Sequence, residues 1–169
     1  QIDIATDIPT PEDVYGVGTV CRIKQMMKQP GSKTVRVMAE GIERGRTLAV
    51  RTDMPCFVAE VEPMPDVAER KTARIEALIR HCCNLFDAYV TVSGNMAPEL
   101  VITVLGSTNA GFVSNFIAQH VFLRPEQKQE LLEQTRPSRR LTLLSKMLLH
   151  ETSVLGLQHQ LEEAAQDRL

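Results

Sequence analysis

The sequence predicts an α+β fold in which a β-rich front half is followed by a helical rear half. In the front half, apolar side chains alternate with polar ones, as in "KTVRVMAEG", and this is the period of a strand. In the rear half, apolar side chains recur at spacings of three and four, which is the period of a helix. Pro63 and Pro65 separate the two patterns, so we predict two domains, residues 1–65 and residues 66–169.

The front half contains four segments with strand character. In the most regular one, Val35, Val37 and Ala39 share a face. Glycines such as Gly41 and Gly45 punctuate the chain between segments. The four segments are "VYGVGTVCRIKQM", "KTVRVMAEG", "GRTLAVRTD" and "PCFVAEVEP". Short strands at even spacing, with turn residues between them, indicate a small antiparallel barrel or sandwich.

The rear half contains five segments with helical character, and the last is the longest. Asp66 is the expected N-cap of the first helix, whose apolar stripe runs from Ile75 to Tyr89 in a helix of about six turns. Gly106 should close the second helix, and Pro125 should lie in the first turn of the fourth. The second to fifth segments are "PELVITVLG", "NAGFVSNFIAQHV", "RPEQKQELLEQT" and "PSRRLTLLSKMLLHETSVLGLQHQLEEAAQDRL".

Composition and charge disfavour several classes of protein. The 169 residues carry a net charge of −2, whereas dedicated nucleic-acid binders have a clear basic excess. No apolar run approaches the roughly 20 residues that span a bilayer, so we expect no membrane partner. The four cysteines include no Cys-x-x-Cys pair, which predicts reduced thiols and a cytoplasmic protein.

The string Gly-Ser-Lys-Thr at residues 31–34 is similar to the end of a phosphate-binding loop. That loop needs an earlier glycine and a helix immediately after its lysine. Here position 26 is a methionine, Ser32 separates Gly31 from Lys33, and a strand pattern follows. We therefore predict a hairpin turn around Pro30 and Gly31 rather than a nucleotide site.

No other segment brings together a catalytic, cofactor-binding or metal-ligating set. The four histidines are scattered, and the nucleophile-elbow motif Gly-x-Ser-x-Gly is absent. His81, Cys82 and Cys83 are consecutive, but consecutive residues point around a helix rather than toward one ion, so zinc is not expected there. We predict no catalytic, cofactor-binding or metal-binding residues in this chain.

Two long segments carry specific motifs. The second segment, residues 116–151, contains "IAQH", "KQELLE" and "RLTLL". The motif residues of the first segment, residues 12–46, are Asp13, Val14, Tyr15, Val17, Gly18, Thr19, Ile23, Lys24, Gln25, Met26, Pro30, Gly31, Arg36, Val37, Glu40, Gly41 and Arg44. Both segments resemble the N-terminal domain of the Lon family of ATP-dependent proteases, and the resemblance covers nearly the whole chain.

This resemblance implies a non-catalytic part of an enzyme. In the family, the N-terminal domain captures unfolded or damaged substrates and helps to assemble a hexamer. The ATPase module, which uses ATP and Mg, and the protease module with its Ser-Lys dyad follow this domain and are absent from this chain. We therefore expect a substrate-recognition and assembly domain of a serine protease that degrades misfolded and regulatory proteins. The alternative is a free-standing protein built on the same domain.

The resemblance also implies a PUA-like barrel, a type shared with RNA-binding domains. Family members begin with strands that this chain lacks, so we expect an incomplete front domain whose edge is exposed or is filled by a neighbouring chain. RNA binding is a less favoured alternative. Lys24, Lys33 and Arg36 are basic, but acidic residues interrupt them and no aromatic stacking platform is evident.

Met26, Met27 and Met38 are the candidate substrate contacts. A surface that captures many sequences needs apolar, adaptable side chains rather than a rigid polar pocket, and methionine provides them. Met26 and Met27 should point to opposite faces of their strand, so at least one should lie away from the core. The alternative is that these methionines fill the core.

Overall fold

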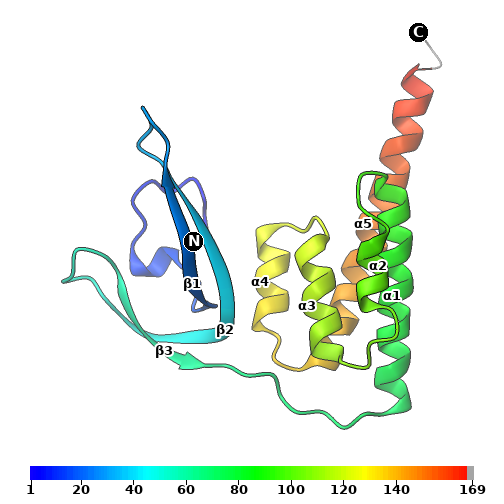
Figure 1. The fold of residues 1–169 in the computed structure, drawn as a ribbon, viewed down its shortest axis with the longest axis horizontal. Helices are drawn as coiled ribbons and strands as arrows, with labels where there is room; N and C mark the ends of the chain where they lie inside the picture. The colour runs from blue at the N-terminus through cyan, green and yellow to red at the C-terminus, as the bar shows by residue number, and fades with distance from the viewer. Residues whose placement is uncertain (167–169) are drawn as a thin grey trace. The chain divides into compact units, whose positions relative to one another are not determined.

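The computed structural model describes residues 1–166. The chain divides into two compact units, Gln1–Pro65 and Asp66–Leu169, which we call the sheet unit and the helical unit. In the described residues the sheet unit holds three strands and the helical unit holds five α-helices, the last of them long (Figure 1). The predicted α+β class and the order of its two halves are confirmed.

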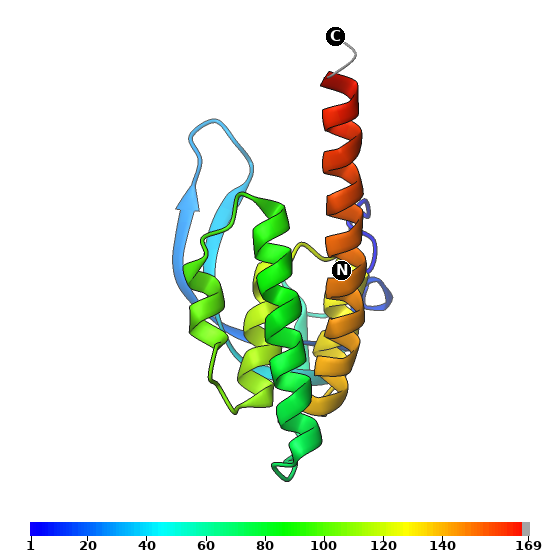
Figure 2. The ribbon, with the colours of Figure 1, turned by 90° about the vertical axis from the view of Figure 1, so that its right-hand side faces the viewer.

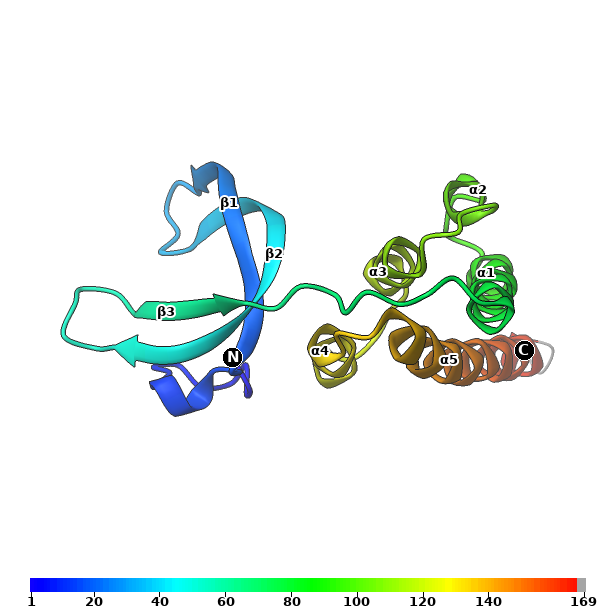
Figure 3. The same ribbon diagram turned by 90° about the horizontal axis from the view of Figure 1, so that it is seen from below.

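The sheet unit is built on an antiparallel sheet with the order β1-β2-β3 (Figure 3). The strands are β1 (Val17–Lys28), β2 (Val35–Arg51) and β3 (Val58–Pro63), preceded by a short 3-10 turn, η1 (Pro11–Asp13). β1 pairs with the first two thirds of β2, and β3 pairs with its last third. In the described residues the sheet is open, so the expected closed barrel is not observed; closure needs more strands than these three.

The prediction of two separate strands on either side of Gly41 and Gly45 is wrong. β2 is one strand that passes through both glycines. Neither glycine has a positive φ, so neither turns the chain. Instead, an extra residue on β2 makes a bulge beside the Cys21–Gly41 pair, and the register shifts there without interrupting the strand.

Gly45 lies where three strands crowd together. It is opposite Gly18 on β1 and Pro63 on β3, and it is the only buried residue between positions 1 and 65. A Cβ atom there would lie 2.3 Å from Cγ1 of Val61, which is too close for two carbon atoms that are not bonded to each other. The glycine is therefore required by close packing between β2 and β3 rather than by a turn.

The five helices described between residues 66 and 166 run alternately up and down, so that α1, α3 and α5 point the same way (Figure 1). Their positions agree with the helical segments predicted from the sequence. The helices are α1 (Ala73–Ser93), α2 (Glu99–Val104), α3 (Ala110–His120), α4 (Pro125–Glu133) and α5 (Pro137–Gln166). No helix in residues 1–166 combines the length and the apolar character needed to cross a bilayer.

The apolar core of the chain lies in the helical unit. Phe86 of α1, Ile117 of α3, and Leu141, Leu144 and Leu148 of α5 are completely buried. They belong to one continuous cluster with buried members on α1 to α5, and Leu155 of α5 packs against it. Burying each large apolar side chain stabilises the fold by about 1.5–3 kcal/mol, so this cluster supplies most of the stability of the helical unit.

The prediction that Asp66 caps the first helix is wrong. α1 begins at Ala73, and its N-cap is Thr72, whose Oγ1 accepts a hydrogen bond from the backbone N–H of Ile75 at 3.2 Å. Residues 66–71, which we call the strap, form neither helix nor strand. Asp66 is occupied elsewhere: its carboxylate forms an ion pair with Arg140 of α5.

The Arg140 guanidinium is buried and fully engaged. Nη1 and Nη2 donate to the two carboxylate oxygens of Asp66 at 2.9 and 2.8 Å. Nη1 also donates to the carbonyl of Gln134 at 2.7 Å, and Nε donates to Oγ of Ser114 at 2.9 Å. One side chain thus joins the strap, α3, the loop before α5 and α5 itself. This ion pair is bidentate, which is the strong geometry for hydrogen bonding between an arginine and a carboxylate.

The C-terminal part of α5 extends past the end of α1 (Figure 2). All buried residues of α5 lie between Pro137 and Leu148. Beyond them, Val154, Leu157 and Leu161 are exposed. They are spaced by three and four residues, so they form one apolar stripe on a helix that has no partner in this part of the chain.

Gly45→Ala should disrupt the pairing of β2 with β3, because the new methyl group collides with Val61. We expect a local loss of about 1–3 kcal/mol, seen as faster amide hydrogen exchange in β3 and unchanged exchange in the helices. Gly18→Ala is the matched control, since Gly18 faces Gly45 across the sheet and has open space around it. Equal effects of the two substitutions would contradict this account.

Asp66→Ala should destabilise the helical unit by about 2–4 kcal/mol, because it leaves the buried Arg140 charge without its anion. Thermal unfolding followed by helix circular dichroism measures the loss. Asp87→Ala, on an exposed position of α1, is the control and should change stability by about 0.5 kcal/mol or less. A tolerated Asp66→Ala would show that the pair does not hold the strap in place.

Candidate functional site

The β1–β2 hairpin (residues 17–51) contains the predicted turn and all three candidate substrate contacts. The turn is confirmed: the backbone N–H of Ser32 donates to the carbonyl of Gln29 at 3.1 Å, and Gly31 has φ = 77°. Proline followed by a left-handed glycine is the sequence preference of a type II turn. Strand β2 follows at Val35, so the Gly-Ser-Lys-Thr string lacks the helix that a phosphate loop requires.

Met26 and Met27 lie on opposite faces of this hairpin, as predicted. Residues that are directly opposed on antiparallel strands share a face. Met26 is opposite Val37, and Met27 is opposite Arg36. Their exposed fractions are 62% and 50%, so neither fills a core in the described structure.

Met38 lies on the same face as Met27. It follows Val37 on β2 and therefore points to the opposite side, where it is paired with Gln25 and is 60% exposed. Next to this pair, a bulge at Lys24 shifts the register, so that Ile23 is opposite Ala39. The hairpin thus places one candidate methionine on one face and two on the other.

The first face, which we call the Met26 face, is mainly apolar. None of its side chains is buried. It presents a methionine, an isoleucine, two valines and an alanine, with one charge, that of Lys28, at the end next to the turn. Its members are Ile23, Met26, Lys28, Val35, Val37 and Ala39. An apolar face of this size attracts another apolar surface in water.

The second face, which we call the Met27 face, mixes methionine with positive charge. Lys24 and Glu40 form an ion pair of 2.7 Å on it, between side chains that are about half exposed. Such an exposed pair contributes little stability. The members of the face are Arg22, Lys24, Gln25, Met27, Arg36, Met38 and Glu40.

The sequence analysis did not single out Arg22, although the structure places it with Arg36 on the Met27 face. Its partner across the strands is Glu40. The missing information was the bulge at Lys24, because a bulge changes which residues on either side of it share a face. A register drawn without the bulge separates Arg22 from Met27 and Met38.

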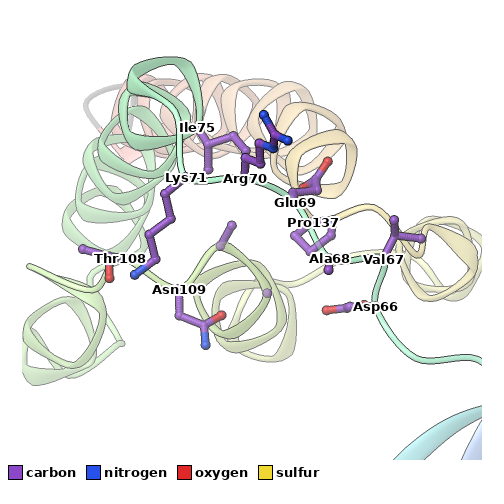
Figure 4. Close-up of a pocket in the computed structure, with 12 residues that line it drawn as sticks. Asp66, Val67, Ala68, Glu69, Arg70, Lys71, Ile75, Thr108, Asn109 and Pro137 are labelled. Carbon is purple, nitrogen blue, oxygen red and sulfur yellow. The ribbon is translucent and has the colours of Figure 1, made fainter.

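The helical unit contains a pocket of about 560 Å³ between the strap and the starts of α1, α3 and α5 (Figure 4). Lys71 extends into it toward Asn109. The two carboxylates at its rim have internal roles, because Asp66 binds Arg140 and Glu69 accepts hydrogen bonds from N and Oγ of Ser138 at 2.8 and 2.6 Å. The pocket therefore lies beside the ion pair and hydrogen bonds that hold the strap against the helices.

The consecutive residues His81, Cys82 and Cys83 do not converge. Cys82 and Cys83 are buried in the helical core, whereas His81 is exposed. Cys82 Sγ lies 2.9 Å from Oγ of Ser145 and 3.3 Å from the carbonyl of Leu141. Burial raises the pKa of the Cys82 thiol to about 11, a shift that the Ser145 hydroxyl only partly offsets. These thiols pack as small apolar groups.

Comparison with known proteins identifies the family. Residues 1–150 match the family of the ATP-dependent protease La (LON) substrate-binding domain. The chain belongs to this family. The Lon resemblance seen in the motifs is therefore confirmed over most of the chain.

Relatives of this Lon substrate-binding domain are much longer proteins. The Lon protease of Clostridioides difficile is 34% identical over 162 residues, and that of Syntrophomonas wolfei is 36% identical over 161 residues. These matches cover 94% and 95% of this chain but 20% of each relative. The chain thus spans about one fifth of the length of the Lon proteases that it matches.

Two solved structures share the fold of this Lon substrate-binding domain. The N-terminal domain of Mycobacterium avium complex Lon protease has a TM-score of 0.63 at 24% identity, covering 86% of this chain and 74% of that one. A Lon N-terminal domain protein from Xanthomonas campestris has a TM-score of 0.50 at 22% identity, covering 80% and 70%.

The buried thiols of this Lon substrate-binding domain predict a loss of stability at alkaline pH. Cys82 has a pKa of about 11 in the folded chain, against 9.0 for an ordinary cysteine thiol. Above that lower value the unfolded chain releases the proton while the folded chain keeps it, so stability falls as pH rises. From about pH 8 to about pH 10, the Cys82 thiol alone should make unfolding easier by about 1 kcal/mol.

Denaturant unfolding at the two pH values measures this effect, with Cys82→Ser as the variant whose pH dependence should be weaker. A thiol reagent gives a second measurement. Cys21 and Cys56 are exposed and should react in the native domain, whereas Cys82 and Cys83 should react only after unfolding. Rapid native reaction of all the thiols would contradict the burial.

Proposed function

We propose that this domain captures unfolded segments of protein substrates on the β1–β2 hairpin, as one part of an ATP-dependent serine protease. The family description, a substrate-binding domain of an ATP-dependent protease, supports this role. The observation that carries the proposal is the exposure of apolar side chains on both faces of one hairpin, led by Met26, Met27 and Met38.

Such a surface suits substrates that share no sequence. Full burial of a methionine side chain stabilises a complex by about 1.5–3 kcal/mol, and these methionines begin at least half exposed, so each contact adds about 1 kcal/mol. Several weak contacts that do not depend on a polar pocket give modest affinity for many chains. Methionine adapts to differing partners because its side chain is unbranched and flexible.

The same proposal includes the degradation of misfolded and regulatory proteins by the parent enzyme. The ATP and Mg of this reaction would bind in its ATPase module, outside this chain. We also propose that the domain helps to assemble the parent hexamer. The exposed stripe of Val154, Leu157 and Leu161 on the projecting half of α5 supports a role in association. Free thiols at Cys21 and Cys56 suit a reducing compartment such as the cytoplasm.

The alternatives have less support. A free-standing protein built on this domain is disfavoured, because the relatives that cover most of this chain are Lon proteases. RNA binding would need stacking aromatic side chains, and residues 17–51 contain none.

Binding of a permanently unfolded protein tests the proposal. The purified domain should bind a reduced and alkylated protein of near-neutral charge, should not bind its native form, and should neither hydrolyse ATP nor cleave casein. The triple variant M26S/M27S/M38S should weaken binding by about tenfold in fluorescence anisotropy, because it removes the apolar contacts of both faces.

Ile102→Ser is the matched control, since Ile102 is an equally exposed apolar side chain on α2, at 67%. It should leave the affinity unchanged. Absence of binding at high protein concentration, or an equal loss in the Ile102 variant, would overturn hairpin capture.

A further inference from the structure

The part of the hairpin nearest its turn, residues 21–40, is a basic segment in an acidic chain. Residues 21–40 contain five basic side chains and one acidic side chain, a net charge of +4, whereas the whole chain carries −2. The charged residues are Arg22, Lys24, Lys28, Lys33, Arg36 and Glu40. All of them are exposed. Positive charge is therefore concentrated on the segment that also exposes the three methionines.

Most of this charge is not neutralised within the molecule. Lys24 takes the one nearby carboxylate, Glu40, at 2.7 Å. Among the ion pairs of residues 1–166, none involves Arg22, Lys28, Lys33 or Arg36. By contrast, Arg51 farther along β2 is paired with Asp53 at 2.8 Å. Residues 21–40 thus present four basic side chains outside any ion pair, while Arg51, at the end of β2, is paired.

The Met27 face places its two methionines next to charged groups. Along β2, Arg36, Met38 and Glu40 occupy every second position, and Arg36 is directly opposite Met27. Arg22 lies beyond Met38 on the neighbouring strand. An extended peptide also repeats its side-chain direction every second residue, so its acidic and apolar side chains can match this spacing.

We propose that the Met27 face selects extended polypeptide segments in which acidic residues alternate with or flank apolar ones. This inference rests on the proposed capture of unfolded protein and adds a preference for charge to it. Arg22 and Arg36 attract the carboxylates, and Met27 and Met38 contact the apolar side chains. Arginine suits this role because its planar guanidinium binds a carboxylate through two hydrogen bonds.

A peptide is the better match than a nucleic acid. The segment contains no Phe, Tyr or Trp on which a base could stack. Its cations lie beside two half-exposed methionines. A phosphate placed against these apolar side chains loses water and gains no hydrogen bond from them. Carboxylates attached to an apolar chain satisfy both kinds of group at once.

Fluorescence anisotropy of the intact domain with a matched set of labelled peptides tests the proposal. The peptides share the same leucine and valine positions and carry Glu, Ser or Lys between them. The Glu peptide should bind about tenfold more tightly than the Ser peptide, with the Lys peptide weakest, and added salt should remove the difference. The double variant R22Q/R36Q should reduce binding of the Glu peptide by about fivefold or more and leave the Ser peptide unchanged.

The control R74Q/K146Q removes the same charge from exposed positions of the helical unit and should not change any affinity. M27S/M38S should weaken the Glu and Ser peptides alike. Equal affinity for the Glu and Ser peptides, with M27S/M38S still weakening both, overturns the charge preference while capture stands. No binding of any peptide overturns both. Single-stranded RNA that binds more tightly than the Glu peptide, and loses affinity in R22Q/R36Q, overturns the peptide assignment.

Discussion

The buried guanidinium of Arg140 constrains the helical unit more than any other polar group described here. A charge removed from water must be surrounded by acceptors, and Arg140 finds them on Asp66, Ser114 and Gln134. Two of these acceptors lie far from it in the sequence. The hydrogen bonds that the Arg140 guanidinium needs therefore determine where the strap lies and how α3 packs against α5.

Other local features follow from this pair. Because Asp66 is held by Arg140, it is not available to cap α1, and Thr72 takes that role. Gly111 must lack a side chain, since a Cβ atom there would lie 2.8 Å from the Asp66 carboxylate. Glu69 accepts a hydrogen bond from Ser138 in the first turn of α5, where its negative charge also interacts favourably with the positive N-terminal end of the helix dipole. Small and polar residues around the strap therefore allow it to bind to the helices.

The two units differ in what their apolar residues do. In the helical unit they are buried in one cluster and supply stability. In the sheet unit only Gly45 is buried between positions 1 and 65, and the apolar side chains of the hairpin remain exposed. The turn end of the hairpin, where β3 does not pair with β2, is a two-stranded ribbon, and such a ribbon is marginally stable alone. Adaptable methionines beside unpaired arginines make contacts with other chains possible without a preformed pocket.

The sequence by itself determined the α+β class, the positions of the five helices, the turn at Pro30 and Gly31, and the family. These features depend on local periodicity, on the conformational limits of proline and glycine, and on contiguous motifs, all of which can be read along the chain. The continuity of β2, the cap of α1 and the grouping of Arg22 with Met27 and Met38 were decided only by tertiary structure. Each of them depends on groups distant in sequence: Val61 packed against Gly45, Arg140 paired with Asp66, and a bulge whose register is set by the opposite strand. Periodicity indicates which face of a helix or strand a residue occupies, but it does not indicate which residue from elsewhere in the chain will contact it.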